Sequence, residues 1–131
     1  MKKAGFEVTT KVGGTGLVAV LKNGDFDRAA IQLAAFLRRY PASGFAPSAR
    51  FWLGNAQYAR RDYKEAIATF RAFVSAAPDH PRAPEALLAL ANSQAEMKDA
   101  KAARKTLEDL LKVYPQSEAA AAAKERLARM K

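Results

Sequence analysis

The stretch that decides the fold is residues 47–78, PSARFWLGNAQYARRDYKEAIATFRAFVSAAP. Its features return at an offset of 37 residues on both sides. The positions that return are Asp25, Asp62 and Asp99; Ala29, Ala66 and Ala103; Leu33, Phe70 and Leu107; and Phe36, Phe73 and Leu110. A fixed period of about 20–50 residues indicates a repeat architecture, whose extended surface usually holds another protein.

The composition of the chain limits which classes of fold and function are possible. The chain has 131 residues, half of them hydrophobic, which suits one domain with a packed core. Its net charge of +9 favours acidic partners. The basic residues are dispersed along the chain, however, so they form either a solvated face or a patch that binds such a partner. The absence of cysteine excludes disulfides and thiolate metal sites. The first residues lack the apolar run of a signal peptide, so we expect a mature or truncated soluble domain.

Prolines and aspartates divide the chain into helices. We expect helices over about 25–40, 47–60, 64–76, 84–97 and 101–113, each with apolar residues at helical spacing. Ser117 then caps a last helix that runs to about residue 130 and has a solvating outer face. The prediction is an all-α fold, an α-solenoid of about three helix pairs with a C-terminal capping helix.

The second unit resembles the tetratricopeptide repeat (TPR). Counted from Pro47, Leu53 and Gly54 stand at places seven and eight, Ala66 at twenty and Phe70 at twenty-four. Gly54 and Ala66 are small where paired helices cross most closely, and Leu53 and Phe70 fill the space beside the crossing. Places four and eleven, usually aromatic, hold Arg50 and Gln57, and we expect Trp52 and Tyr58 to supply the missing volume.

This resemblance gives a domain division. A TPR domain is predicted over 22–131, with repeats at about 10–46, 47–83 and 84–116 and a capping helix at 117–130. Residues 1–21 form an N-terminal arm or a degenerate first helix.

The spacing between repeats narrows the resemblance. The period exceeds the usual length of about 34 residues, and the excess lies in the proline-containing segments 40–47 and 78–84. Over 22–131 the chain resembles the C-terminal domain of the CpoB/YbgF family, periplasmic cell division coordinators of the Tol-Pal system. Outer-membrane assembly lipoproteins share similar extended repeats.

That resemblance implies a periplasmic, non-enzymatic adaptor. Its expected partners are TolA and a bifunctional peptidoglycan synthase, and its role is to couple envelope constriction with wall synthesis during division. The family carries a trimerising coiled coil that this chain lacks, so we expect this fragment to be monomeric and a full-length protein to be trimeric.

In stacked helix pairs, places two, five, nine and twelve of each repeat face the concave groove. The candidate groove residues are Ser48, Phe51, Asn55, Tyr58, Glu85, Leu88 and Asn92. Asparagine suits a peptide backbone because it both donates and accepts hydrogen bonds. Alternatively, the asparagines bond a neighbouring helix, and Phe51 and Tyr58 are buried in the stack.

Catalysis is not expected. His80 is the only histidine and lies between prolines in a turn, so no metal site or nucleophile triad can be assembled. We expect no cofactor, small-molecule substrate or membrane insertion, and nucleic acid is disfavoured as a partner. Two alternatives to a peptide-binding groove remain: binding of an anionic polymer through the basic charges, and oligomerisation through an incomplete first repeat.

Overall fold

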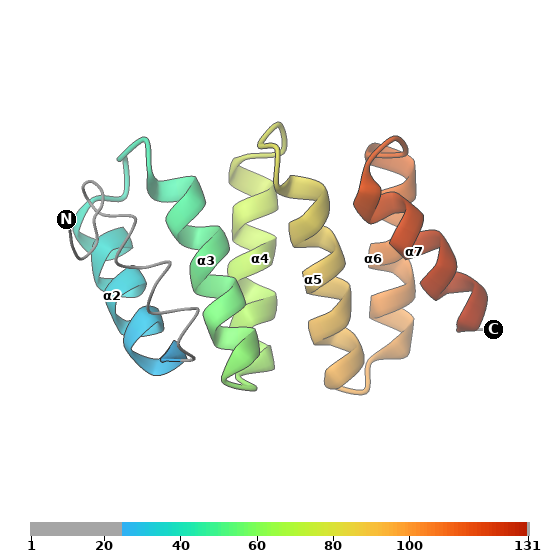
Figure 1. The fold of residues 1–131 in the computed structure, drawn as a ribbon, viewed down its shortest axis with the longest axis horizontal. Helices are drawn as coiled ribbons and strands as arrows, with labels where there is room; N and C mark the ends of the chain where they lie inside the picture. Colours follow the sequence, from blue (N-terminus) through green and yellow to red (C-terminus); the bar gives the residue numbers. More distant parts are fainter. Residues whose placement is uncertain (1–24, 131) are drawn as a thin grey trace.

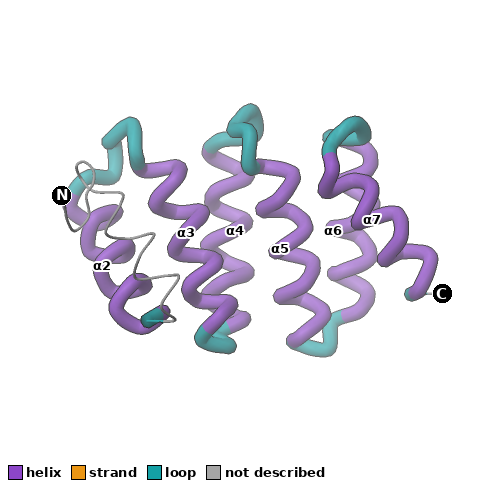
Figure 2. Tube along the Cα trace, viewed as in Figure 1, coloured by secondary structure: helices purple, strands orange, loops and turns teal. Residues whose placement is uncertain are grey.

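The protein is described by a computed structural model that covers residues 25–130, and this part of the chain is entirely helices and turns (Figures 1 and 2). Its helices are α2 (Phe26–Arg39), α3 (Ala46–Ala59), α4 (Tyr63–Ala76), α5 (Ala83–Glu96), α6 (Ala100–Val113) and α7 (Glu118–Arg129). Each packs antiparallel against the next along the chain. The predicted TPR-like α-solenoid is therefore confirmed. The predicted arm or degenerate helix at 1–21 lies outside the described residues, and the division into repeats stays a prediction.

Local signals set the helix boundaries. α3 and α5 each carry a proline in their first turn, where its missing N–H leaves no hydrogen bond unmade. Asp25 and Asp99 cap α2 and α6 by accepting from backbone N–H groups three residues later, both at 3.2 Å. Ser117 caps α7 in the same way at 3.0 Å. The proline and aspartate signals repeat every 37 residues, so helices of equal length repeat with them.

Helices α3 and α4 approach each other closely at Gly54. A Cβ atom added to Gly54 would stand 2.7 Å from the ring of Phe70, which is fully buried. The glycine is therefore required by the approach of the two helices, as the TPR pattern predicts. Phe70 belongs to the main core cluster, which continues through α5 and α6 to Ala123 of α7.

Each of the two helix pairs contains one glutamine–threonine pair between its helices. This pair explains why glutamine stands at a place of the TPR pattern that is usually aromatic. Gln57 on α3 lies 2.6 Å from the hydroxyl of Thr69 on α4, and Gln94 on α5 lies 2.6 Å from that of Thr106 on α6. Each glutamine is thus bonded to the other helix of its pair, so an aromatic residue is not required at this position. Trp52 does add volume, since it packs against both core clusters.

The helices form two faces. α3 touches α5 and α5 touches α7, so these three helices line one face of the stack, while α4 and α6 lie behind them (Figure 1). We call the first the α3–α5–α7 face.

Candidate partner-binding groove

Six of the seven predicted groove residues have solvent-accessible side chains in the described structure. They are Ser48, Asn55 and Tyr58 on α3 and Glu85, Leu88 and Asn92 on α5. Their spacing of seven and three residues on α3, and of three and four on α5, places each set on one side of its helix.

Phe51 differs from the other six because only 2% of its surface is exposed. Its ring packs against Phe70 and Phe73, at centroid distances of 6.3 and 5.6 Å. The Arg82 guanidinium covers it from the solvent side, 5.3 Å from the ring centroid. Of the two interpretations left open by the sequence, burial is the observed one: Phe51 supports the face from beneath and offers no surface to a ligand.

The two asparagines, although 37 residues apart, have different partners. Asn55 donates from Nδ2 to the carbonyl of Phe51 on its own helix, at 3.0 Å. Asn92 accepts through Oδ1 from the Arg126 guanidinium of α7. The residue 37 before Arg126 is Ala89, which has no group to bond Asn55. Within residues 25–130 the amide oxygen of Asn55 therefore has no hydrogen-bond donor, whereas that of Asn92 is bonded to the capping helix.

Tyr58 lies where α3, α5 and α7 meet. Burial raises the pKa of its hydroxyl above the ordinary value, and the negative charge of Glu96 and the neighbouring Tyr63 add to the rise. The positive charge of Arg126 opposes it. The ring stacks edge-on against Tyr63, with centroids 5.3 Å apart. Glu96 and Arg126 thus belong to the surroundings of this face, which the pattern of a single repeat did not reveal because they come from other repeats.

A cleft opens between α5 and α7 and has a volume of about 580 Å³. Pro84, Glu85 and Leu88 form the α5 side. The remaining lining residues are Pro81, Ser117, Glu118, Ala119 and Ala122. Leu88 and the alanines supply apolar surface to the cleft, and Glu85 and Glu118 supply negative charge, although the chain as a whole has a net charge of +9. The sequence pattern indicated Glu85 and Leu88 but not α7, which was expected only to be a solvating cap.

The other chemistry-bearing residues give no catalytic arrangement. His80 accepts a hydrogen bond from the backbone N–H of Arg82 at 3.1 Å, and its ring packs against Phe73 at 5.1 Å, as suits a turn residue. Within residues 25–130, no group of three or more His, Cys, Asp and Glu side chains could hold a metal ion. No helix in that range has the length and apolar character needed to cross a membrane.

Comparison with known proteins shows the family of this chain. The family model described as YfiO, outer membrane lipoprotein, matches residues 16–131. Two sequences of the cell division coordinator CpoB from Pseudomonas putida, one from strain KT2440, are each 44% identical to this chain over 43 residues. That match covers 33% of this chain and 16% of each CpoB sequence, so it compares only a short segment with a much longer protein.

Proposed function

Because the chain belongs to the YfiO family of outer membrane lipoproteins, we propose that it is a non-catalytic adaptor of the cell envelope. It holds a segment of a partner protein on the α3–α5–α7 face. The observation that carries this proposal is the set of accessible polar and apolar side chains on one side of α3 and α5, next to the cleft between α5 and α7.

The composition of this face supports a protein partner. Two of its three helices carry few charges: α3 has only Arg50, and α5 has only Glu85 and Glu96, while the charges of α7 are of both signs. Asn55 and Tyr58 provide hydrogen-bonding groups, and Leu88 provides an apolar anchor in the cleft. A helix or extended segment that lies across helices uses this mixture of apolar anchors and hydrogen bonds.

The partner itself is proposed from the similarities. Similarity to a cell division coordinator favours TolA, with a peptidoglycan synthase as a second partner, and a role in coordinating constriction with wall synthesis. Membership of the outer membrane lipoprotein family favours the alternative, an adaptor in outer-membrane assembly. Either role favours a periplasmic location.

The basic charge gives less support to an anionic polymer. Five basic side chains form ion pairs with acidic neighbours: Arg28 with Asp25, Arg60 with Asp27, Arg82 with Glu85, Lys105 with Asp109 and Arg129 with Glu125. A polymer site needs a continuous basic stripe, and its affinity falls steeply with salt.

The first test is a calorimetric titration of the chain with the periplasmic region of TolA, at low and at high salt. We expect saturable binding that persists at high salt. The double variant Asn55→Ala/Asn92→Ala removes the amide oxygen of Asn55 and the amide nitrogen of Asn92, the two amide groups that the bonds to Phe51 and Arg126 leave available to a partner. At about 1 kcal/mol for each group, the affinity should drop by about 10- to 30-fold.

The matched control is Gln32→Ala, which removes an exposed amide from α2. It should bind like the unmodified chain, and circular dichroism should show that all variants remain folded. Undiminished binding by the folded double variant would rule out the α3–α5–α7 face. If TolA does not bind at all, the outer-membrane assembly partners are tested in its place.

A further inference from the structure

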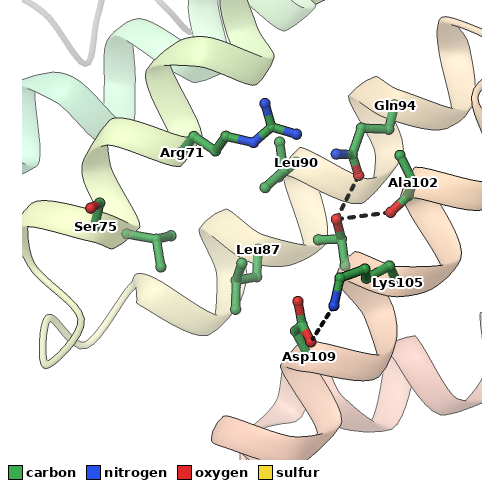
Figure 3. Close-up of a pocket in the computed structure, with 10 residues that line it drawn as sticks. Arg71, Ser75, Leu87, Leu90, Gln94, Ala102, Lys105 and Asp109 are labelled. Atoms are coloured by element: carbon green, nitrogen blue, oxygen red, sulfur yellow. Dashed lines mark hydrogen bonds and ion pairs between the residues drawn. The ribbon is translucent and has the colours of Figure 1, made fainter.

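A second cavity lies on the opposite side of α5 and plays no part in the proposed groove (Figure 3). It has a volume of about 390 Å³, is open to solvent and is lined by α4, α5 and α6; we call it the α4–α6 cavity. Leu87 and Leu90, buried side chains of α5, and Val74 of α4 form its apolar floor. Its charged residues are Arg71 of α4 and Lys105 and Asp109 of α6.

Helix geometry separates the two sites. The groove residues of α5 are at positions 85, 88 and 92, and the cavity residues are at 87, 90 and 94. At 3.6 residues per turn, the two sets lie roughly half a turn apart around the helix axis. A ligand in the cavity therefore leaves the groove accessible.

Gln94 and Thr106 line the cavity together with Arg71 and supply its polar groups. Gln94 is 3% exposed, and its side chain satisfies its neighbours when its amide oxygen faces Arg71, with Nη2 3.3 Å away. Its amide nitrogen then donates to the Thr106 hydroxyl at 2.6 Å, and that hydroxyl donates to the carbonyl of Ala102 at 3.0 Å. Figure 3 shows Arg71 extending from α4 towards Gln94. In this orientation Gln94 accepts one hydrogen bond from the exposed Arg71 side chain at the cavity.

The internal repeat shows which of these features the fold requires. Shifted back by 37 residues, Gln94 and Thr106 become Gln57 and Thr69, which form the same 2.6 Å pair, so this pair belongs to the architecture. The charged residues do not repeat. The counterparts of Arg71, Lys105 and Asp109 are Ala34, Ala68 and Ala72, and Leu87 is replaced by Arg50. The fold tolerates alanine at all three charged positions, so it does not account for the charges.

The charges at the cavity are not balanced. Lys105 pairs with Asp109 at 3.7 Å, a partly exposed contact of small energetic value. Within residues 25–130, no carboxylate lies at ion-pair distance from Arg71. A guanidinium has five N–H donors in a planar fork that fits a carboxylate, and Gln94 occupies only part of this capacity.

We propose that the α4–α6 cavity is a second protein-binding site, which takes an acidic segment of a partner. An apolar side chain of that segment packs on Leu87 and Leu90, and an adjacent Asp or Glu carboxylate bonds to Arg71, with Lys105 alongside. The volume of about 390 Å³ lies at the lower end of the range of about 300–1,000 Å³ for ligand pockets, which leaves room for one or two side chains of a longer chain. The positive charge of Arg71 and the net charge of +9 give the complementarity.

The test uses the full chain and a dye-labelled decapeptide of alternating glutamate and leucine, followed by fluorescence anisotropy. We expect saturable binding, at least tenfold weaker for Arg71→Gln and intermediate for Arg71→Lys, which keeps the charge but loses the fork. The control variant Lys101→Gln removes the same charge from α6 outside the cavity and should bind like the unmodified chain. Asn55→Ala/Asn92→Ala should also leave this affinity unchanged, which separates the cavity from the groove.

Two peptide controls complete the experiment. Replacing glutamate by lysine should abolish binding, and replacing leucine by serine should weaken it at least tenfold. Equal affinities for Arg71→Gln and the unmodified chain would overturn the proposal, as would a peptide that does not bind. Binding of decanoate at Arg71 without binding of the peptide would assign the cavity to small amphiphiles and overturn it as well.

Discussion

At the scale of single residues, the repeats balance volume between facing positions. Gly54 faces Phe70 at the α3–α4 crossing, where a methyl group on Gly54 would lie 2.7 Å from the ring. The equivalent positions 37 residues later hold Ala91 and Leu107, both buried. The first of these repeats thus pairs glycine with the larger phenylalanine, and the next pairs the larger alanine with the smaller leucine.

This balance makes Gly54→Ala destabilising although alanine favours helices. The added methyl group must displace a fully buried ring, and such overpacking costs about 1–3 kcal/mol, more than the gain of up to about 1 kcal/mol in helix propensity. Urea unfolding followed by circular dichroism should show the loss. Gly54→Ala/Phe70→Leu copies the next repeat and should recover most of it.

The control is Gly44→Ala, since an added Cβ at Gly44 meets nothing within 4 Å. It should leave the free energy of unfolding unchanged or slightly raised. A Gly54→Ala variant as stable as the unmodified chain would mean that Phe70 can move aside.

At the scale of elements, the turns inside each helix pair are built identically. Arg61 and Lys98, 37 residues apart, both adopt a φ of 66°, in the left-handed region. After α3, the N–H groups of Arg61 and Asp62 bond to the carbonyls of Tyr58 and Gln57; the corresponding two bonds follow α5. This is the Schellman motif, and it turns the chain sharply enough for the second helix to pack against the first. Neither position carries the glycine that usually marks this motif, so the sequence pattern did not predict it.

The last element, α7, is held by a narrow buried stripe. Ala120 and Ala123 are buried, Ala123 within the main core cluster, whereas Ala121 is exposed. The Arg104 guanidinium adds a hydrogen bond to the carbonyl of Met130 at 2.9 Å. Because these side chains are small, α7 packs closely against α5 and α6 at the end of the stack.

Ala123→Glu should detach this helix, because a carboxylate without a partner would enter the core. We expect a loss of at least about 2 kcal/mol, which lowers the Tm by at least about 8 °C. Ala121→Glu places the same side chain on the exposed side and should leave the Tm nearly unchanged. Thermal unfolding by circular dichroism measures both, and equal Tm values for the two variants would show that α7 does not contribute to the stack.

At the scale of the whole molecule, two tyrosines link neighbouring repeats. Tyr58 lies near Glu96 of α5 and Arg126 of α7, and Tyr114 donates its hydroxyl to the carbonyl of Pro78 at 2.6 Å. Burial raises the pKa of both hydroxyls; the charge of Glu96 adds to the rise at Tyr58, and that of Asp79 at Tyr114.

These raised pKa values predict how stability depends on pH. An unfolded tyrosine loses its proton near pH 10, whereas in the folded protein these two hold it to higher pH. Their contribution is therefore complete below about pH 10 and is lost as the pH rises through the folded pKa values. Phenolate absorbance, taken as the difference between the unmodified chain and Tyr58→Phe or Tyr114→Phe, should give midpoints above about 10. Midpoints at or below that value would contradict the burial of these hydroxyls, and Glu96→Gln should lower the midpoint of Tyr58.

The sequence by itself determined the helices and their order. Local signals act within a few residues of themselves: proline at the start of α3 and α5, aspartate before α2 and α6, and Ser117 before α7. The predicted helices therefore match the observed bounds to within about one to two residues. The 37-residue period determined the stacking, because equal helix pairs with equal turns repeat the same packing. The candidate groove positions were chosen by the same period; six of the seven have accessible side chains, and their role in binding stays a prediction.

Only the tertiary structure decided what each candidate touches. Phe51 is buried because rings from α4 and the Arg82 guanidinium cover it, and Asn92 differs from Asn55 because α7 brings an arginine where α5 has an alanine. The α4–α6 cavity likewise depends on three helices from two repeats. A pattern within one repeat cannot show such contacts, since they are made by side chains that are distant in sequence and become neighbours only when the repeats stack.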